Sequence, residues 1–211
     1  GGSGYFNGST DYLSFTNNSS TNLGTGDFTF EAWVYPATLT SYNMLFAAGG
    51  VNHYLCLLWG ATSSVFGLNA YNGAVSVSST PQTIPINQWV HIAFVRISGT
   101  LYFYVNGVQN GSAAFSGTFG SSTGTATIGY NAAYAGSYYY PGYMQGVRMV
   151  QGVGVYTGAF TPPKAPLSTS GSASASAYPS TTNVNTSFAA SSCSLLLNYT
   201  NAGIIDNTGK N

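Results

Sequence analysis

The chain has 211 residues, of which 44% are hydrophobic and only 4% are charged, and its formal net charge is +0. Binding to nucleic acid or to an anionic membrane surface needs clustered Lys or Arg, and no such cluster occurs in this sequence. No apolar run approaches the roughly 20 residues that span a bilayer, so we expect neither nucleic-acid binding nor membrane insertion.

The low charge also bears on the surface of the protein. Neutral Ser, Thr, Asn, Gly and Tyr must cover it, and a net charge near zero favours association. Such a surface suits a protein packed in a large assembly or one that stacks tyrosines on sugars. An interpretation of equal weight is that secreted β proteins are often rich in these residues without special purpose.

Strand signals begin at the N-terminus and recur along the chain. Residues 5–6 and 12–15 flank a polar loop that starts with Asn7-Gly8, which predicts a hairpin. Residues 27–36 then alternate, and one face of this predicted strand carries Phe28, Phe30, Ala32 and Val34. The tryptophans Trp33, Trp59 and Trp89 lie inside predicted strands, so we expect them in the core.

Further strands follow towards residue 129. Short apolar runs at 44–48, 54–59 and 65–70 read as buried strands. Residues 89–108 predict the clearest hairpin, with Ser98-Gly99 in its tight turn. No stretch longer than a turn shows the helical period of 3.6 residues, so the chain is predicted to be all-β.

The composition changes after Pro162. Residues 168–192 are mostly Ser, Thr and Ala, which predicts a linker that buries too little apolar area to fold alone. Residues 193–211 return to a strand-like pattern, and the residues that we expect to form an assembly strand are Leu195, Leu196, Leu197 and Tyr199.

Four stretches together resemble one known family. They are residues 5–13, 27–34, 89–107 and the closing strand with its Pro-Pro stop at 142–163. This order is similar to that of laminin-G-like, concanavalin A-like domains, of the kind found in tailed-phage structural proteins. The resemblance implies a two-sheet antiparallel jelly-roll sandwich over residues 1–167, located in a virion or outside the cell, whose concave or rim surface binds glycans.

The tail resembles the opening of another such module. One interpretation is that the chain, which starts without Met, is a piece of a tandem array. The other is that residues 193–211 add a strand to a sheet, either their own or that of a neighbouring subunit. A strand given to the next subunit would build a filament when the contact is head-to-tail.

Catalytic and metal sites find little support in the sequence. A glycosidase needs two carboxylates about the scissile bond, and the four acids here are scattered, so we expect no enzyme. Arg96 and Arg148 lie in predicted strands and are expected to pair with Glu31 or with a carbonyl. The family's closing strand usually has Asp where this chain has Gln145-Gly146. That departure removes a calcium ligand, leaves Asp11 as the metal candidate and predicts no cofactor.

Glycan binding is the remaining candidate activity. Amphipathic rings suit the faces of sugars, and the candidate residues are Tyr138, Tyr139, Tyr140, Tyr143, Tyr71 and Tyr134. The competing interpretation, which we favour, places these rings in the core or at a subunit interface.

The leading hypothesis is therefore a non-enzymatic structural or adhesion module of a virion or extracellular fibre. Its partners would be further copies or other fibre proteins. The alternative is a lectin-like carbohydrate-binding module of a larger secreted or phage tail protein, whose partner would be a cell-surface glycan.

Overall fold

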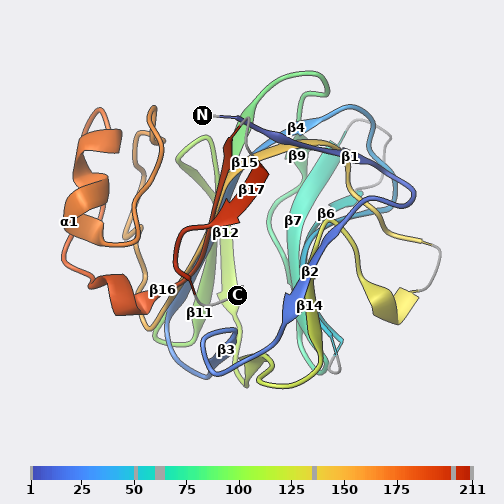
Figure 1. The fold of residues 1–211 in the computed structure, drawn as a ribbon, viewed down its shortest axis with the longest axis horizontal. Coiled ribbons are helices and arrows are strands. Elements are labelled where there is room, and N and C mark those ends of the chain that lie inside the picture. Colours follow the sequence, from blue (N-terminus) through green and yellow to red (C-terminus); the bar gives the residue numbers. More distant parts are fainter. Residues whose placement is uncertain (1, 50–51, 60–64, 135–136, 201–202, 210–211) are drawn as a thin grey trace.

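The computed structural model describes residues 2–49, 52–59, 65–134, 137–200 and 203–209. As predicted, they form an all-β sandwich of two facing antiparallel sheets (Figure 1). Within these residues, no helix is long and apolar enough to cross a membrane.

Sheet A has the strand order β12-β11-β10-β4-β15-β16-β17, and β1 pairs with β15. Its strands are β1 (Gly4–Asn7), β4 (Phe28–Pro36), β10 (Val90–Ile97), β11 (Thr100–Val105), β12 (Val108–Ala114), β15 (Pro141–Gln151), β16 (Cys193–Thr200) and β17 (Gly203–Asp206).

Sheet B has the order β2-β14-β5-β6-β7-β8, and β9 pairs with β7. Its strands are β2 (Leu13–Thr16), β5 (Tyr42–Ala48), β6 (His53–Trp59), β7 (Val65–Asn72), β8 (Ser76–Ser78), β9 (Gln82–Thr83) and β14 (Thr125–Ile128). The remaining elements are the pair β3 (Asn22–Gly24) and β13 (Phe119–Gly120), and the short helices η1 (Ala132–Tyr134), α1 (Gly171–Ser174), η2 (Ala175–Ala177) and η3 (Ala190–Ser192).

The main core lies between the sheets and follows from the alternation of β4. Phe28, Phe30, Ala32 and Val34 are all fully buried there, as predicted. Phe30 of sheet A meets Phe46 of sheet B with 6.1 Å between ring centroids, so this pair links the two layers. Burying such a side chain contributes about 1.5–3 kcal/mol. The face of β4 that carries the apolar residues therefore turns towards the core.

Two turns explain the predicted hairpin around β10 and β11. Ser98-Gly99 joins the two strands, and both residues have positive φ, as a tight hairpin turn requires. Gly107 follows β11 with φ +78, and a Cβ there would lie 1.9 Å from the carbonyl oxygen of Phe160. This glycine therefore lets the chain after β15 approach sheet A closely.

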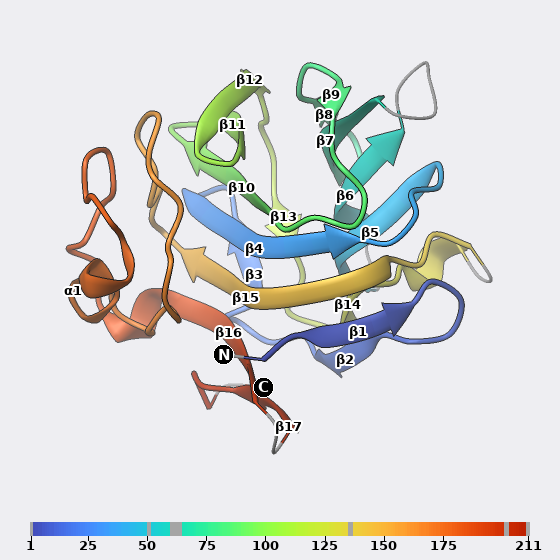
Figure 2. The same cartoon turned by 90° about the horizontal axis from the view of Figure 1, so that it is seen from above.

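Residues 151–192 form a third layer on the outer face of sheet A, which we call the cover layer (Figures 1 and 2). Its buried side chains contact Ala93, Val95 and Val150 of the sheet, and they are Val155, Tyr156, Phe160, Leu167, Ala177, Tyr178 and Phe188. Residues 168–192 are thus packed, where the sequence predicts a linker. The few bulky residues in this Ser/Thr/Ala-rich stretch are spaced so that each anchors it to the sheet.

The C-terminal segment adds to the chain's own sheet. β16 pairs with β15, and β17 pairs with β16. Leu195, Leu197 and Tyr199 point into the main core, while Leu196 packs under the cover layer. The expected assembly strand is therefore an internal strand of sheet A, because β15 offers its edge to β16. Described residues from each of the three predicted parts, 1–167, 168–192 and 193–211, contact sheet A.

Two further expectations concern tryptophan and cysteine. Trp33 is half-buried and Trp89 is 39% exposed, because both lie on the outer face of sheet A and not between the sheets, so their placement in the core was wrong. The side chain of Trp59 lies outside the described residues. Cys56 and Cys193 are both buried, and a buried cysteine packs as a small hydrophobic side chain.

Candidate functional site

The six candidate tyrosines do not form one surface. Tyr140 is fully buried in the main core, and its hydroxyl donates to the carbonyl of Tyr143 at 3.2 Å. Tyr139 stacks on Tyr130 with 4.3 Å between centroids. Tyr140 therefore cannot contact a glycan, which corrects the prediction. It follows Tyr139 in the chain, and only the structure shows which of the two faces inward.

Three of the candidates do gather, on the outer face of sheet B. Tyr71, Tyr134 and Tyr138 join Tyr42 and Tyr54 there, and we call these five residues the tyrosine cluster. Ring centroids are 4.6 Å apart for Tyr42 and Tyr138 and 5.4 Å apart for Tyr54 and Tyr71. The rings pack on one another and over the buried Met44 and Cys56, so much of their apolar surface is already used.

Tyr143, the sixth candidate, belongs to a row of rings on the outer face of sheet A. The row crosses β1, β15 and β4 in register, from Tyr5 to Tyr143 to Tyr35, and ends at Trp89 just before β10. Successive centroids are 5.0, 5.8 and 5.5 Å apart. Tyr5 is 57% exposed and Tyr143 is 39% exposed. This aromatic row is a continuous apolar strip open to solvent.

A groove of about 770 Å³ adjoins the row at Trp89. Side chains of sheet A form its floor. Residues 163–167, which belong to the cover layer, form one wall. The Trp33 indole donates to the carbonyl of Pro163 at 3.2 Å, which ties this wall to the floor. The described lining residues are Gly2, Trp33, Trp89, His91, Gln145, Gly146, Pro163, Lys164, Ala165, Pro166, Leu167, Asn198, Tyr199 and Asn207.

His91 connects the groove to a buried polar network. Its Nε2 lies 3.1 Å from the Glu31 carboxylate. A carboxylate only accepts hydrogen bonds, so this contact places a proton on Nε2. Nδ1 is buried and has no hydrogen-bond partner within the described residues.

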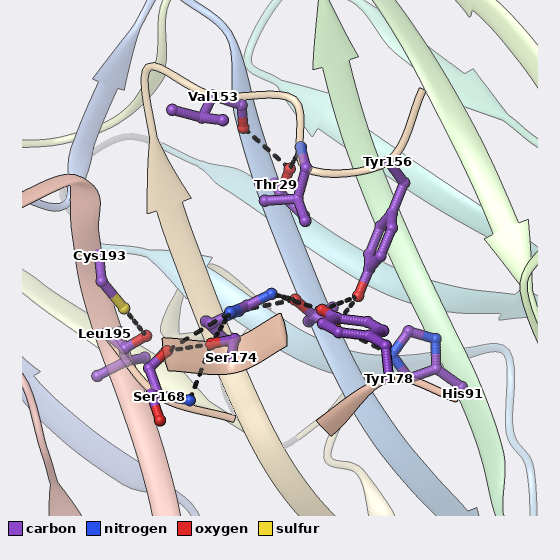
Figure 3. A network of polar contacts seen from close by, with 12 residues as sticks. Thr29, His91, Val153, Tyr156, Ser168, Ser174, Tyr178, Cys193 and Leu195 are labelled. Atoms are coloured by element: carbon purple, nitrogen blue, oxygen red, sulfur yellow. Dashed lines mark hydrogen bonds and ion pairs between the residues drawn. The ribbon is translucent and has the colours of Figure 1, made fainter. Parts of the chain in front are cut away.

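Beneath the cover layer, Tyr156 and Tyr178 lie close to His91 in a polar network (Figure 3), and its centre is the carboxylate of Glu31. Arg148 contacts the same carboxylate with Nη2 at 2.6 Å, and the hydroxyl of Tyr156 also donates to it. Arg148 further donates to the hydroxyls of Ser174 at 3.1 Å and Tyr178 at 2.9 Å, both from the cover layer. Sheet A and the cover layer are thus joined by one charged cluster.

Electrostatics keep the Glu31 carboxyl ionised in this cluster. Burial alone would raise its pKa, because burial disfavours the charged form. The positive charge of Arg148 and the hydrogen bonds from His91 and Tyr156 outweigh burial and lower the pKa to about 2. Burial and the nearby Glu31 raise the pKa of Tyr156 well above its usual value, so this phenol stays protonated. The carboxylate is fully buried and already bonded, which is the structural role predicted for it.

The second arginine also follows the prediction. Arg96 is buried and donates to the carbonyl oxygens of Gly24, Gly26 and Gly117 at 2.6 to 3.0 Å. Both arginines therefore act inside the protein. Neither contributes to a charged surface.

The metal candidate Asp11 lies in an exposed turn. Its carboxylate accepts from the backbone N–H of Asn7 at 3.2 Å and from the hydroxyl of Thr10 at 3.4 Å, which closes the turn. In the described part of the chain, no three His, Cys, Asp or Glu residues gather as metal ligands. That the protein works without a cofactor stays a prediction.

Tyr5, Tyr35 and Trp89 are the residues of the aromatic row that the sequence analysis missed. They could have been found from the alternation of side chains along each strand, which shows which residues point away from the core. Trp89, like Tyr35, stands at an outward position, one residue from a core-facing valine. The prediction that every tryptophan lies in the core did not take this alternation into account.

Comparison with known proteins places the fold. Residues 7–162 match the model of a laminin-G family described as the concanavalin A-like lectin/glucanases superfamily. The chain is similar to a candidate carbohydrate-binding protein from Bacteroides ovatus, with 17% identity and a TM-score of 0.62 over 96% of this chain and 55% of that one. This chain thus spans about half the length of that protein. No curated protein matches the chain.

Two further solved structures share the fold. Domain 4 of AbnA, an extracellular GH43 arabinanase from Geobacillus stearothermophilus solved in complex with arabinotriose, has 21% identity and a TM-score of 0.55 over 70% of this chain and 69% of that one. Domains LG4-5 of the mouse laminin α1 chain have 12% identity and a TM-score of 0.50 over 69% of this chain and 40% of that one. Since the family model covers most of its residues, the chain belongs to the laminin-G-like group of the concanavalin A-like lectin/glucanases superfamily.

Proposed function

We propose that this chain is a non-catalytic, lectin-like carbohydrate-binding module that holds a glycan chain on the aromatic row. The row carries this proposal, because four rings in cross-strand register present an exposed apolar strip on a surface with almost no charge. Amphipathic rings pair an apolar face with a polar edge, which suits the faces and hydroxyls of sugars. The lectin-like alternative from the sequence thus becomes the leading one.

Two observations support this site. The row opens into a groove with amide side chains from Gln145, Asn198 and Asn207, and amides donate and accept hydrogen bonds as sugar hydroxyls require. Domain 4 of AbnA, which shares the fold, was solved with arabinotriose. Because sandwich folds of this group host unrelated functions, the side chains of this site support the proposal and the fold alone does not.

The test is a glycan array followed by calorimetry on the parent and two variants, Trp89→Ala and Tyr143→Ala. Each ring removed should weaken binding about two- to tenfold, because stacking of one ring contributes roughly 0.5–1.5 kcal/mol beyond its buried area. Tyr71→Ala, in the tyrosine cluster on the opposite sheet, is the matched control and should bind like the parent. Binding lost in Tyr71→Ala and kept in Trp89→Ala would move the site to sheet B.

A structural role in an extracellular fibre or virion is the second candidate. It rests on β17, the last strand of sheet A on that side, where Ile204 is 44% exposed and Ile205 is 48% exposed. Edge strands with apolar side chains pair readily with further chains. Both roles place the protein outside the cell or on a virion, and they are compatible because the row and β17 are separate surfaces.

A further inference from the structure

We propose that the groove beside the aromatic row selects a saccharide unit that carries a carboxylate, such as a uronic acid, through Lys164. This proposal rests on the proposed function, since the row supplies general affinity for a glycan chain. The groove would add the choice of sugar.

Lys164 is the exposed positive charge of this surface. It lies in the groove wall, and its exposed side chain has no acidic partner within the described residues. Arg96 and Arg148 are buried and donate their hydrogen bonds inside the protein, to carbonyls, to hydroxyls and to Glu31. Among the residues that the structure describes, Lys164 is therefore the cation that a ligand in the groove would meet.

No acidic side chain opposes this charge among the described lining residues. Glu31 lies behind His91 and is neutralised by Arg148. Asp206 precedes the lining residue Asn207, and its carboxylate accepts hydrogen bonds from the backbone N–H groups of Leu196 and Thr208. A ligand carboxylate would therefore approach Lys164 without a like charge in the groove lining.

A second observation points independently to a bound ligand. His91 is 1% exposed and lines the groove, and its Nδ1 has no hydrogen-bond partner in the described part of the chain. A buried polar atom without a partner is unfavourable, and a ligand that supplies the partner recovers this loss. A sugar hydroxyl both donates and accepts hydrogen bonds, so it can be the partner of Nδ1.

The chemistry of the groove therefore has three parts. The indole of Trp89 offers an apolar surface, Nδ1 of His91 lacks a hydrogen-bond partner that a hydroxyl can supply, and Lys164 attracts an anion. A uronic acid has all three matching features, whereas a neutral hexose lacks the anion. The wall that carries Lys164 begins at residue 163, just after the residues that match the family model, so this selectivity belongs to the C-terminal part of the chain.

The experiment compares oligogalacturonate with its methyl ester, which has the same sugar backbone without the charge. Binding is measured by calorimetry at low and high salt. The acid should bind about fivefold more tightly than the ester at low salt, as expected for one exposed ion pair, and the preference should shrink at high salt.

Three variants separate the charge from the platform. Lys164→Gln should lose the preference for the acid and keep the affinity for the ester, whereas Lys164→Arg should keep both. Trp89→Ala should weaken acid and ester alike. Circular dichroism and thermal unfolding of each variant confirm that the fold is intact, which is expected because Lys164 is exposed.

Two outcomes would overturn the inference, and they are distinguishable. If acid and ester bind equally and Trp89→Ala weakens both, the groove does not select an anion while the proposed function holds. If neither uronate nor any neutral glycan binds, the proposed function and this inference both fail.

Discussion

At the scale of single residues, Glu31 shows how a charged side chain stays stable in a core. Its carboxylate is fully buried, yet Arg148, His91 and Tyr156 supply contacts from three separate segments of the chain. A buried ion pair adds little over a well-packed apolar pair, but removing one partner leaves the other charge uncompensated. We therefore expect the network to fix how the cover layer sits on sheet A.

Glu31→Gln should lower the free energy of unfolding by about 3–5 kcal/mol at neutral pH, because Arg148 then keeps a buried, unpaired charge. The pKa of Glu31 is lowered from 4.5 to about 2 in the folded state. Its contribution is present above pH 4.5 and is lost as the pH falls towards 2, a change of about 3 kcal/mol.

Denaturant unfolding between pH 7 and pH 2 checks this prediction. The parent should lose more stability on acidification than Glu31→Gln, which no longer has the titrating group. Equal pH dependence in the two proteins would contradict the assignment.

At the scale of elements, the cover layer depends on a few anchors. Phe188 is buried, and its ring lies against the Arg148 guanidinium at 5.3 Å. Gly171, the first residue of α1, lies so close to the chain at Thr186 that a Cβ there would be 2.6 Å from the Thr186 backbone. These contacts explain how a Ser/Thr/Ala-rich stretch is held in place.

Phe188→Ala should destabilise the protein by about 3–5 kcal/mol, because it removes a large buried side chain and leaves a cavity. It should also make residues 168–192 a site of cleavage in limited proteolysis, while the parent resists. Val108→Ala is the control, since Val108 is 65% exposed on β12, and its effect should stay within about 0.5 kcal/mol. Rapid cleavage of the parent in this segment would restore the linker interpretation.

At the scale of the whole molecule, the two edge strands of sheet A, β12 and β17, differ in their contacts with the rest of the protein. The backbone N–H of Thr80, beyond β8, donates to the carbonyl of Asn110 on β12, so that edge is joined to the other sheet. β17 lies at the opposite edge and extends away from the body of the sandwich (Figure 2). If the protein forms fibres, we expect β17 to make the contact.

Ile205→Lys should then weaken self-association about tenfold or more, because a charge on an edge strand opposes pairing. Analytical ultracentrifugation across a range of concentrations measures this, with Val108→Lys on β12 as the matched control. A parent that stays monomeric at every concentration would remove the fibre role and leave the carbohydrate-binding proposal untouched.

The sequence predicted the parts of the fold that depend on local pattern. The alternation of β4 and the Ser98-Gly99 turn each depend only on residues that are neighbours in the sequence, and both were confirmed. The cover layer was missed because Tyr178 and Phe188 are isolated in sequence and gain their burial only from sheet A. Composition describes how much a segment can bury alone, not what it can bury against a neighbour.

The candidate site was predicted in part. Tyr143 belongs to the aromatic row, while Tyr140 beside it in the tyrosine-rich loop turned out to be in the core. The groove could not be foreseen, because its floor and wall come from segments more than 60 residues apart along the chain, such as His91 and Lys164. Long-range assembly of this kind leaves no mark in a single motif.

The place of β16 between β15 and β17 in sheet A has a practical consequence for protein engineering. The residues shared with the family stop at 162, but the strand that shields β15 comes from 193–200. A fusion or truncation that ends at residue 162 would remove this strand. It would also remove the part of the cover layer, residues 163–192, that packs over Glu31 and Arg148. The segment that matches the family is therefore shorter than the segment that completes sheet A and covers Glu31.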